Sequence, residues 1–411
     1  YSANGKITLD VSGAGGIKND ITALDTGNGA EFNISGVNIE LLGVDNLGEA
    51  NHYIGLKGRV GEEAGDGKIT ADADGNVYIN TYGNINAPEI SGKTISAVNF
   101  AVITDGELKA TNGSVDVVNN GSIIRTSLVS ETDAVNFEAN AGSTTQDAVI
   151  TAKDAVTYKA NAGTEKQPVV TQGVVITAEK DVDIDASSDV GFVAIRTDES
   201  VDIDSNNGAS VSVEQVESQS LEAVVAQDIS IGSADVVGKA DLRAGNDVNV
   251  DVVEAEELVA NADNDINVGT ASVDNVAGLY ANGDVNVSAI EAQALAVEAE
   301  NDIAVGTASI ASGAELTAEN DVSVNVIETQ DLAVEAGNNF NGQQIVAHDI
   351  GIVAGKDITV SSEQEVNSLA GVAPVDPSPV NGTDQSAGKL TGEVRTDYTS
   401  YADDKGSAAL V

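Results

Sequence analysis

The chain has 411 residues, of which 41% are hydrophobic, and this fraction is large enough to build a core. Trp, Met and Cys are absent and aromatic residues make up only 3%, so the core must be filled by small aliphatic side chains, without disulfides. With 66 acidic and 19 basic side chains, the formal charge of -47 repels phosphate backbones and anionic lipid headgroups. Nucleic acid and membrane surfaces are therefore excluded from the expected partners.

The start of the sequence and its hydropathy predict an exported protein. The chain begins at Tyr1, and no run of 18 apolar residues occurs in it. Because a membrane-spanning helix needs about 20 apolar residues, we expect no membrane insertion. We also expect that a signal peptide has been removed, which predicts an extracellular or cell-surface location. The absence of Cys is compatible with that location.

Residues 1–130 have strand-and-turn character without a clear period. The stretch "NVYINTYGNIN" at 76–86 is typical of strands separated by Gly and Asn turns. Because these strands cannot be aligned with one another, we expect either irregular turns of a β-solenoid or a distinct N-terminal cap.

A short acidic segment in this region resembles part of a calcium loop. Asp72, Asp74 and Asn76 occupy the first, third and fifth ligand positions of such a loop. The glycine expected at the sixth position is missing, and Gly83 replaces the bidentate Glu expected at the twelfth. The sequence therefore favours a plain β-turn, with a calcium site as the alternative.

A rare basic island occurs at 52–59, "HYIGLKGR". It brings together His52, Tyr53, Lys57 and Arg59 in an otherwise acidic chain. A surface loop is one explanation. The alternative is a docking patch for an acidic surface on a neighbouring subunit.

From residue 131 the sequence becomes repetitive, first loosely and then with a fixed period. The segments "DAVNFEA" at 133–139 and "DAVTYKA" at 154–160 introduce the pattern, and the series becomes regular after Asp181. One aspartate per unit then recurs at intervals of 18 or 19 residues, and a period this short predicts a solenoid with one turn per unit. The regular markers are Asp228, Asp247, Asp265, Asp284, Asp302 and Asp321.

The residues around each marker alternate as they do in strands. Val or Ile stands one and three residues after it, as at Val248 and Val250, with a polar residue between. Ala stands three residues before every marker from Asp247 to Asp357, which indicates a tight interior corner. We therefore predict an all-β fold, a single-stranded parallel β-helix with turns of 18–19 residues.

The true repeat spans two turns, or 37 residues. At seven and five residues before the marker, one turn has Ala240 and Leu242, and the next has Leu258 and Ala260. Large side chains therefore stack on small ones, so that adjacent layers fill the core without voids. One turn offers too little apolar area to offset the entropy of ordering its backbone, so the turns are stable only when stacked.

The stacked aspartates pose an electrostatic question. Like charges at a spacing of about 4.8 Å repel by roughly 1 kcal/mol per pair in water. Each carboxylate can be stabilised by corner backbone N–H groups, with a neighbouring Asn column adding an amide ladder. Alternatively, calcium can bridge the column. The candidate residues are Asp247, Asp265, Asp284, Asp302 and Asp321.

The regular helix is predicted to end near residue 368. Pro374, Pro377 and Pro379 follow the last recognisable strand and cannot continue a parallel ladder. We therefore divide the chain into irregular turns or a cap at 1–130, a regular β-helix at 131–368 and a tail at 369–411. This tail is predicted to dock on a neighbouring subunit.

The motif A-x-N-D-[VI]-x-V in units of 18 to 19 residues, over about 175–360, resembles the repeats of filamentous-haemagglutinin-like adhesins, the exoproteins of two-partner secretion. The resemblance implies a right-handed β-helix, a secreted or surface location and adhesion through the exterior of the coil.

Three functions are compatible with such a chain. The first is a structural subunit of an extracellular bacterial fibre, a homopolymer joined end to end, because both ends of a β-helix expose strand edges. The second is a monomeric adhesin that binds glycans or proteins of a host or neighbouring cell. The third, a β-helical polysaccharide lyase or tailspike-like enzyme, is disfavoured because the regular turns leave no room for the long loops of a catalytic cleft. We therefore expect no enzymatic activity and no cofactor other than calcium.

Overall fold

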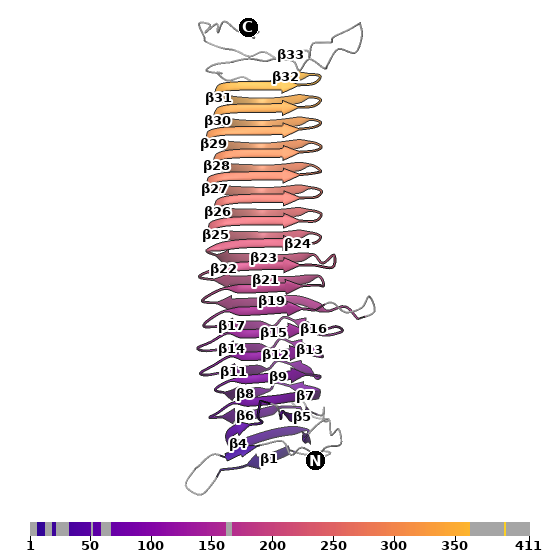
Figure 1. The fold of residues 1–411 in the computed structure, drawn as a ribbon, viewed down its shortest axis with the longest axis vertical. Coiled ribbons are helices and arrows are strands. Elements are labelled where there is room, and N and C mark those ends of the chain that lie inside the picture. The colour runs from indigo at the N-terminus through magenta and orange to yellow at the C-terminus, as the bar shows by residue number, and fades with distance from the viewer. Residues whose placement is uncertain are drawn as a thin grey trace. The chain divides into compact units, whose positions relative to one another are not determined.

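The structure is a computed structural model that describes residues 6–12, 19–21, 33–50, 52–58, 67–161, 167–361 and 390–391. Within these ranges the chain contains strands and no helix, and the named strands pair in parallel. This confirms the predicted parallel β-solenoid. The chain divides into two compact units, residues 1–219 and 220–411, which we describe separately (Figure 1).

The first unit is built from short strands, about three to a turn. The strands β10–β12, β13–β15 and β16–β18 form three successive turns, and each strand pairs with its counterpart in the next. The unit contains β1 (Lys6–Asp10), β2 (Asn19–Ile21), β3 (Ile34–Gly36), β4 (Asn38–Leu47), β5 (Ile54–Gly58), β6 (Ile69–Ala73), β7 (Val77–Asn86), β8 (Glu89–Gly92), β9 (Ile95–Asn99), β10 (Val102–Thr104), β11 (Glu107–Ala110), β12 (Val115–Asn119), β13 (Ser122–Ile124), β14 (Ser127–Ser130), β15 (Val135–Ala139), β16 (Thr144–Gln146), β17 (Val149–Ala152), β18 (Val156–Ala160), β19 (Val170–Ala178), β20 (Val182–Ala186), β21 (Val190–Thr197), β22 (Ser200–Ser205) and β23 (Val211–Ser218).

In-register pairing places equivalent side chains above one another in the core of this unit. Leu108, Leu128 and Ile150 form one such buried column. The rings of Phe137 and Tyr158 stack with centroids 5.0 Å apart, and both are buried. The predicted boundary at residue 130 falls inside this unit, where β12 pairs with β15 on its other side.

The second unit has longer strands, each of which bends round most of a turn. Two consecutive outward-facing residues, such as Asp251 and Val252, interrupt the inside-outside alternation and mark the corners. The unit contains β24 (Ser220–Val225), β25 (Ile229–Ala244), β26 (Val248–Ala262), β27 (Ile266–Ala281), β28 (Val285–Ala299), β29 (Ile303–Ala318), β30 (Val322–Ala336), β31 (Phe340–Ala354), β32 (Ile358–Val360) and β33 (Leu390–Thr391).

The predicted core columns of this unit are confirmed. Ala240 pairs with Leu258 and Leu242 with Ala260, and all four side chains are buried. A further face that we did not predict from the sequence follows the same rule, since Ala234 pairs with Val253, which stands over Ala271. Large side chains therefore alternate with small ones on more than one wall of the coil.

The alternation of 18 and 19 residues has a local cause. The corner before the third wall has two residues in β25, Val237 and Gly238, but only Glu256 in β26, and the register shifts at this point. The longer corner returns in β27 with Asp274 and Asn275. One extra corner residue in every second turn thus produces the 37-residue repeat.

The predicted tail at 369–411 lies outside the described residues except for β33. This two-residue strand pairs in parallel with β32, Ile358 opposite Leu390. The predicted end of the regular helix near 368 also lies outside the described residues.

Candidate binding surface

The repeated aspartates of the second unit form a continuous hydrogen-bonded ladder at one corner. The Asp247 Oδ1 atom accepts a hydrogen bond from the backbone N–H of Asp265 at 3.1 Å and another from Asn264 Nδ2 at 2.7 Å. The same backbone contact recurs in the next turns, from Asp284 to Asp265 at 2.8 Å, from Asp302 to Asp284 at 3.1 Å, from Asp321 to Asp302 at 2.9 Å and from Asn339 to Asp321 at 2.9 Å.

These contacts agree with the alternative in which backbone N–H groups at the corner stabilise each carboxylate. Each carboxylate receives the partial positive charge of an amide in the next turn, and such charge-assisted bonds are stronger than neutral ones. The Asn column adds side-chain bonds, for example Asn338 Nδ2 to Asn320 Oδ1 at 3.0 Å. Among the residues that the structure describes, no group of three His, Asp or Glu side chains is arranged to hold a metal ion. Calcium binding by this column stays a prediction.

The candidate calcium loop at 72–76 spreads its side chains toward different neighbours. Asp72 Oδ1 accepts a hydrogen bond from Ser91 Oγ at 2.7 Å, whereas Asn76 Oδ1 accepts one from Thr94 Oγ1 at 3.0 Å. Asp74 lies in the bend between β6 and β7, and its backbone N–H donates to the carbonyl of Val44. The segment therefore serves as a hydrogen-bonded turn, and calcium binding there also stays a prediction.

The described part of the basic island lies on the first unit and forms local contacts. The Tyr53 hydroxyl is 2.7 Å from Ser96 Oγ, and its ring packs edge-on against Tyr78 with centroids 5.7 Å apart. His52 Nδ1 lies 3.9 Å from Glu49 Oε2, and both side chains are exposed. Arg59 lies outside the described residues. The proposed docking role of this island is not tested by these contacts.

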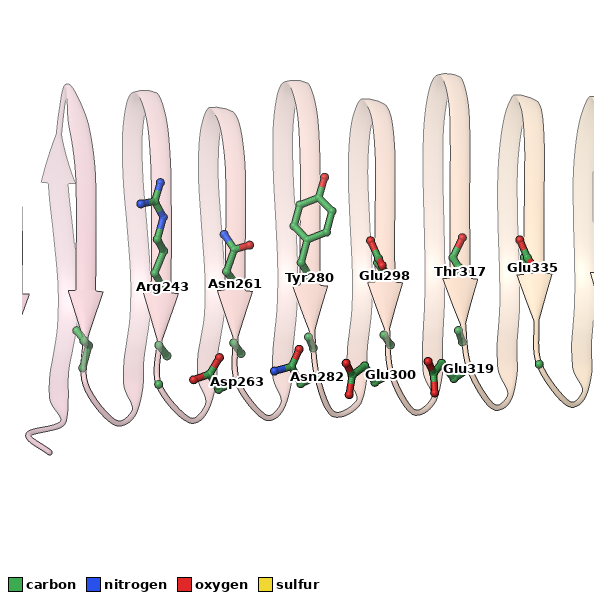
Figure 2. A pocket seen from close by; sticks show the side chains of 18 of the residues that line it. Arg243, Asn261, Asp263, Tyr280, Asn282, Glu298, Glu300, Thr317, Glu319 and Glu335 are labelled. Atoms are coloured by element: carbon green, nitrogen blue, oxygen red, sulfur yellow. The ribbon is translucent and has the colours of Figure 1, made fainter.

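A groove of about 900 Å³ follows the corner of the second unit (Figure 2). Its floor contains the small residues of the Ala column, such as Ala262, Ala281 and Ala299. Figure 2 shows two rows of longer side chains beside this floor. One row projects from the strand ends and contains Arg243, Asn261, Tyr280, Glu298, Thr317 and Glu335, and the other follows the corner and contains Asp263, Asn282, Glu300 and Glu319.

The constant Ala at the corner explains why a groove exists at all. Ala262, Ala281 and Ala299 are buried and short, so the longer residues on each side project beyond them. Together the two rows offer carboxylate, amide and hydroxyl groups, with successive members of a row about 4.8 Å apart. Such a surface can form hydrogen bonds with an extended polar polymer that lies along the corner. Sequence reasoning identified the Ala column but not the groove.

One aromatic side chain interrupts the polar row. Tyr280 is 40% exposed. A Cβ atom added to Gly278 would lie 2.9 Å from Tyr280 Cε2, so the ring rests against the glycine two residues before it. Tyr280 therefore lies on the wall of the coil beside the groove.

Comparison with protein-family models, with curated proteins and with solved structures finds no match. The fold and the surface place the chain in a structural class, the acidic β-solenoid repeat proteins. No helix in the described ranges has the length and apolar character needed to cross a membrane.

Proposed function

We propose that the protein is a structural subunit of an extracellular bacterial fibre and that subunits join end to end through strand edges. The proposal extends to a location outside the cell or at its surface. It is compatible with the resemblance to filamentous-haemagglutinin-like repeats, and we propose that the chain is related to that family.

The observation that carries the proposal is the in-register parallel stacking of whole turns. Each turn from β26 to β31 pairs along most of its backbone with the turn before it, so the coil grows by adding one strand edge to the next. The terminal edge of such a stack is a template for a strand from another chain. In the first unit β1 pairs with β4 and β2 also pairs with β4, so β1 contributes a second candidate edge.

The test is deletion of the two ends, one at a time. Removal of residues 372–411, or of residues 1–12, should leave the coil folded, as judged by circular dichroism, and abolish lengthening into threads under negative-stain microscopy. The complete chain at the same concentrations is the control. Unchanged threads in both deletions would contradict end joining.

A second candidate, a monomeric surface adhesin, is favoured by the corner groove with its rows of hydrogen-bonding side chains. In that case the complete chain stays single at every concentration and binds glycans or proteins of another cell. Replacing Asn261, Tyr280 and Glu298 together by Ala should then abolish binding while the melting temperature is retained.

A further inference from the structure

One wall of the second unit carries a single charged residue, Glu298, in its two central turns, β27 and β28. Three outward-facing columns cross this wall in eight consecutive turns, β24 to β31, and we call it the pairing face. The columns run from Ser220 to Asp349, from Glu222 to Gly351 and from Val224 to Val353, and successive members are in register.

The centre of the pairing face is apolar and small. Val276 and Tyr280 are 47% and 40% exposed, and Gly278 and Ala296 lie beside them. A shallow hollow of about 500 Å³ extends from Val276 to Gly351. Exposed apolar side chains beside small residues and a hollow are typical of a surface that packs against another surface.

Two turns near opposite ends of the pairing face, β25 and β30, carry opposite charge. In β25, Lys239 Nζ lies 2.6 Å from Asp241 Oδ2, and Arg243 donates to both Asp241 oxygens at 2.9 and 3.0 Å. One buried carboxylate thus holds two half-exposed cations in place, and this turn is net positive. In β30 the equivalent positions are Asp331 and Glu335, both exposed.

We propose that two copies of this chain associate side by side through the pairing face, in antiparallel orientation about a two-fold axis that passes between β27 and β28. This pairing is lateral and does not depend on end joining. In such a pair β25 of one copy faces β30 of the other. Lys239 then lies opposite Asp331 of the second copy, and Arg243 opposite Glu335 of the second copy.

The same register places each remaining carboxylate of the face, apart from Asp331 and Glu335, opposite an uncharged residue. Glu257 faces Gly313, and Glu222 faces Gly351, so that long side chains meet glycines. Glu298 faces the Tyr280 hydroxyl, which can donate a hydrogen bond to it. By symmetry the interface contains four ion pairs and no like-charge contact, a complementarity that favours one register over others.

Other arrangements of the same two faces bring like charges together. In a parallel pair Lys239 would face Arg243, and Asp331 would face Glu335. Moving the antiparallel axis by half a turn, onto β28, would place Glu298 opposite itself, and moving it onto β27 would place Asp241 opposite Glu315. Like-charge contacts at an interface oppose association, so the stated register is the favoured one.

The size of the face indicates a reversible contact. Eight turns at about 4.8 Å and five residues at about 3.3 Å give roughly 600 Å² per copy. The pair buries about 1,200 Å² in total, the lower end of the range for specific interfaces. We therefore expect micromolar dissociation.

Charge reversal and charge exchange test the register on the complete chain. Arg243→Glu and Glu335→Arg should each raise the dissociation constant of the pair about tenfold or more in sedimentation experiments, because two attractive contacts become repulsive. The double variant Arg243→Glu/Glu335→Arg restores opposite charges and should restore pairing. Lys356→Glu, which makes the same charge change off the face, should have little effect. Equal weakening by Lys356→Glu, or no rescue by the double variant, would overturn the proposal.

Disulfide trapping gives an independent readout, because the chain has no native Cys. A mixture of the Lys239→Cys and Asp331→Cys proteins should form a cross-linked dimer under mild oxidation, whereas Lys239→Cys with Glu328→Cys, on another wall of β30, should not. Equal cross-linking in both mixtures, or a complete chain without lateral pairs at about 1 mM, contradicts the interface. Threads that persist when the pairs are lost would separate this contact from end joining.

Discussion

The carboxylate of Asp265 has two opposing effects on the stability of the fold. It lies between Asp247 and Asp284 in a column of like charges, yet its Oδ1 accepts the backbone N–H of Asp284 at 2.8 Å. A charge-assisted bond of this kind offsets a repulsion of about 1 kcal/mol per exposed pair. The hydrogen bond that this oxygen accepts and the repulsion between neighbouring carboxylates therefore act on stability in opposite directions.

Substitution of Asp265 separates these two effects. Asp265→Ala removes the acceptor and should lower the free energy of unfolding by about 1 kcal/mol. Asp265→Asn keeps an acceptor and removes one charge from the column, so stability should be unchanged or higher. Urea unfolding of the three proteins at pH 7 measures both effects. An Asn variant as unstable as the Ala variant would show that the negative charge itself is required.

Tyr158 predicts a loss of stability in alkali. Its ring is buried against Phe137 and Phe192, and burial raises the pKa of the hydroxyl to about 12, although its hydrogen bonds with Thr171 and Thr145 partly oppose the increase. The folded state therefore holds this proton more tightly than the unfolded state. The stabilisation is complete below the unfolded pKa near 10 and is lost as pH rises toward 12, by about 1.4 kcal/mol per pH unit.

Tyr158→Phe should remove this contribution to the pH dependence. The variant loses the hydrogen bond to Thr171 and is less stable at pH 8, but its stability should decline less steeply between pH 10 and 12. Urea unfolding across this range gives the slopes, and the exposed Tyr280→Phe variant is the control. Parallel curves for wild type and Tyr158→Phe would show that the buried hydroxyl does not control alkaline unfolding.

At the scale of the strand, the repeat is the pair of turns rather than the single turn. Leu258 in β26 stacks on Ala240 in β25 and on Ala277 in β27. Corner length alternates in the same way, with Gly238 present in β25 and no counterpart in β26. A single turn is therefore out of phase with its immediate neighbour and in phase with its second neighbour, in both packing and corner geometry.

Two deletions test the two-turn repeat. Removal of 248–284, which is two turns, leaves Leu stacked on Ala and should give a shorter coil with one cooperative transition. Removal of 248–265, which is one turn, brings Leu242 over Leu279 and Ala240 over Ala277, creating both overpacking and a void that cost several kcal/mol. The single-turn deletion should therefore melt at a lower temperature although it removes fewer residues. The opposite order would contradict the two-turn repeat.

The strand pattern was predictable wherever side chains repeat with a constant offset. The Leu and Ala columns and the Asp marker recur at fixed positions, so the sequence identified one wall and one corner of the second unit. The wall of Ala234 and Val253 was not predicted because it follows a corner at which two consecutive outward-facing residues interrupt the inside-outside alternation. The groove could not be predicted, because it depends on how far Arg243 and Tyr280 project beyond the Ala floor.

For the whole molecule the dominant property is the charge of -47. Self-repulsion at this net charge opposes compact structure, so added salt should stabilise the fold. At 0.15 M ionic strength the screening length is about 8 Å, longer than the spacing of about 4.8 Å between turns. Salt therefore weakens the long-range repulsion but leaves neighbouring aspartates coupled, and their stabilisation depends on the N–H contacts of the ladder.

The melting temperature of the complete chain in calcium and magnesium salts tests whether calcium binds to the Asp column. If the ladder of Asp265 and its neighbours is stabilised by backbone N–H groups, CaCl₂ and MgCl₂ at equal ionic strength should raise the melting temperature equally. Calcium bound at a specific site would instead raise the melting temperature in proportion to the logarithm of the free calcium concentration, as any ligand of the native state does. Thermal melts from 0.1 to 10 mM of each salt, a range of about 100-fold, distinguish the two cases. A calcium-specific increase that disappears in Asp265→Asn would assign the ion to the Asp column, and one that disappears in Asp72→Asn would assign it to the turn at 72–76.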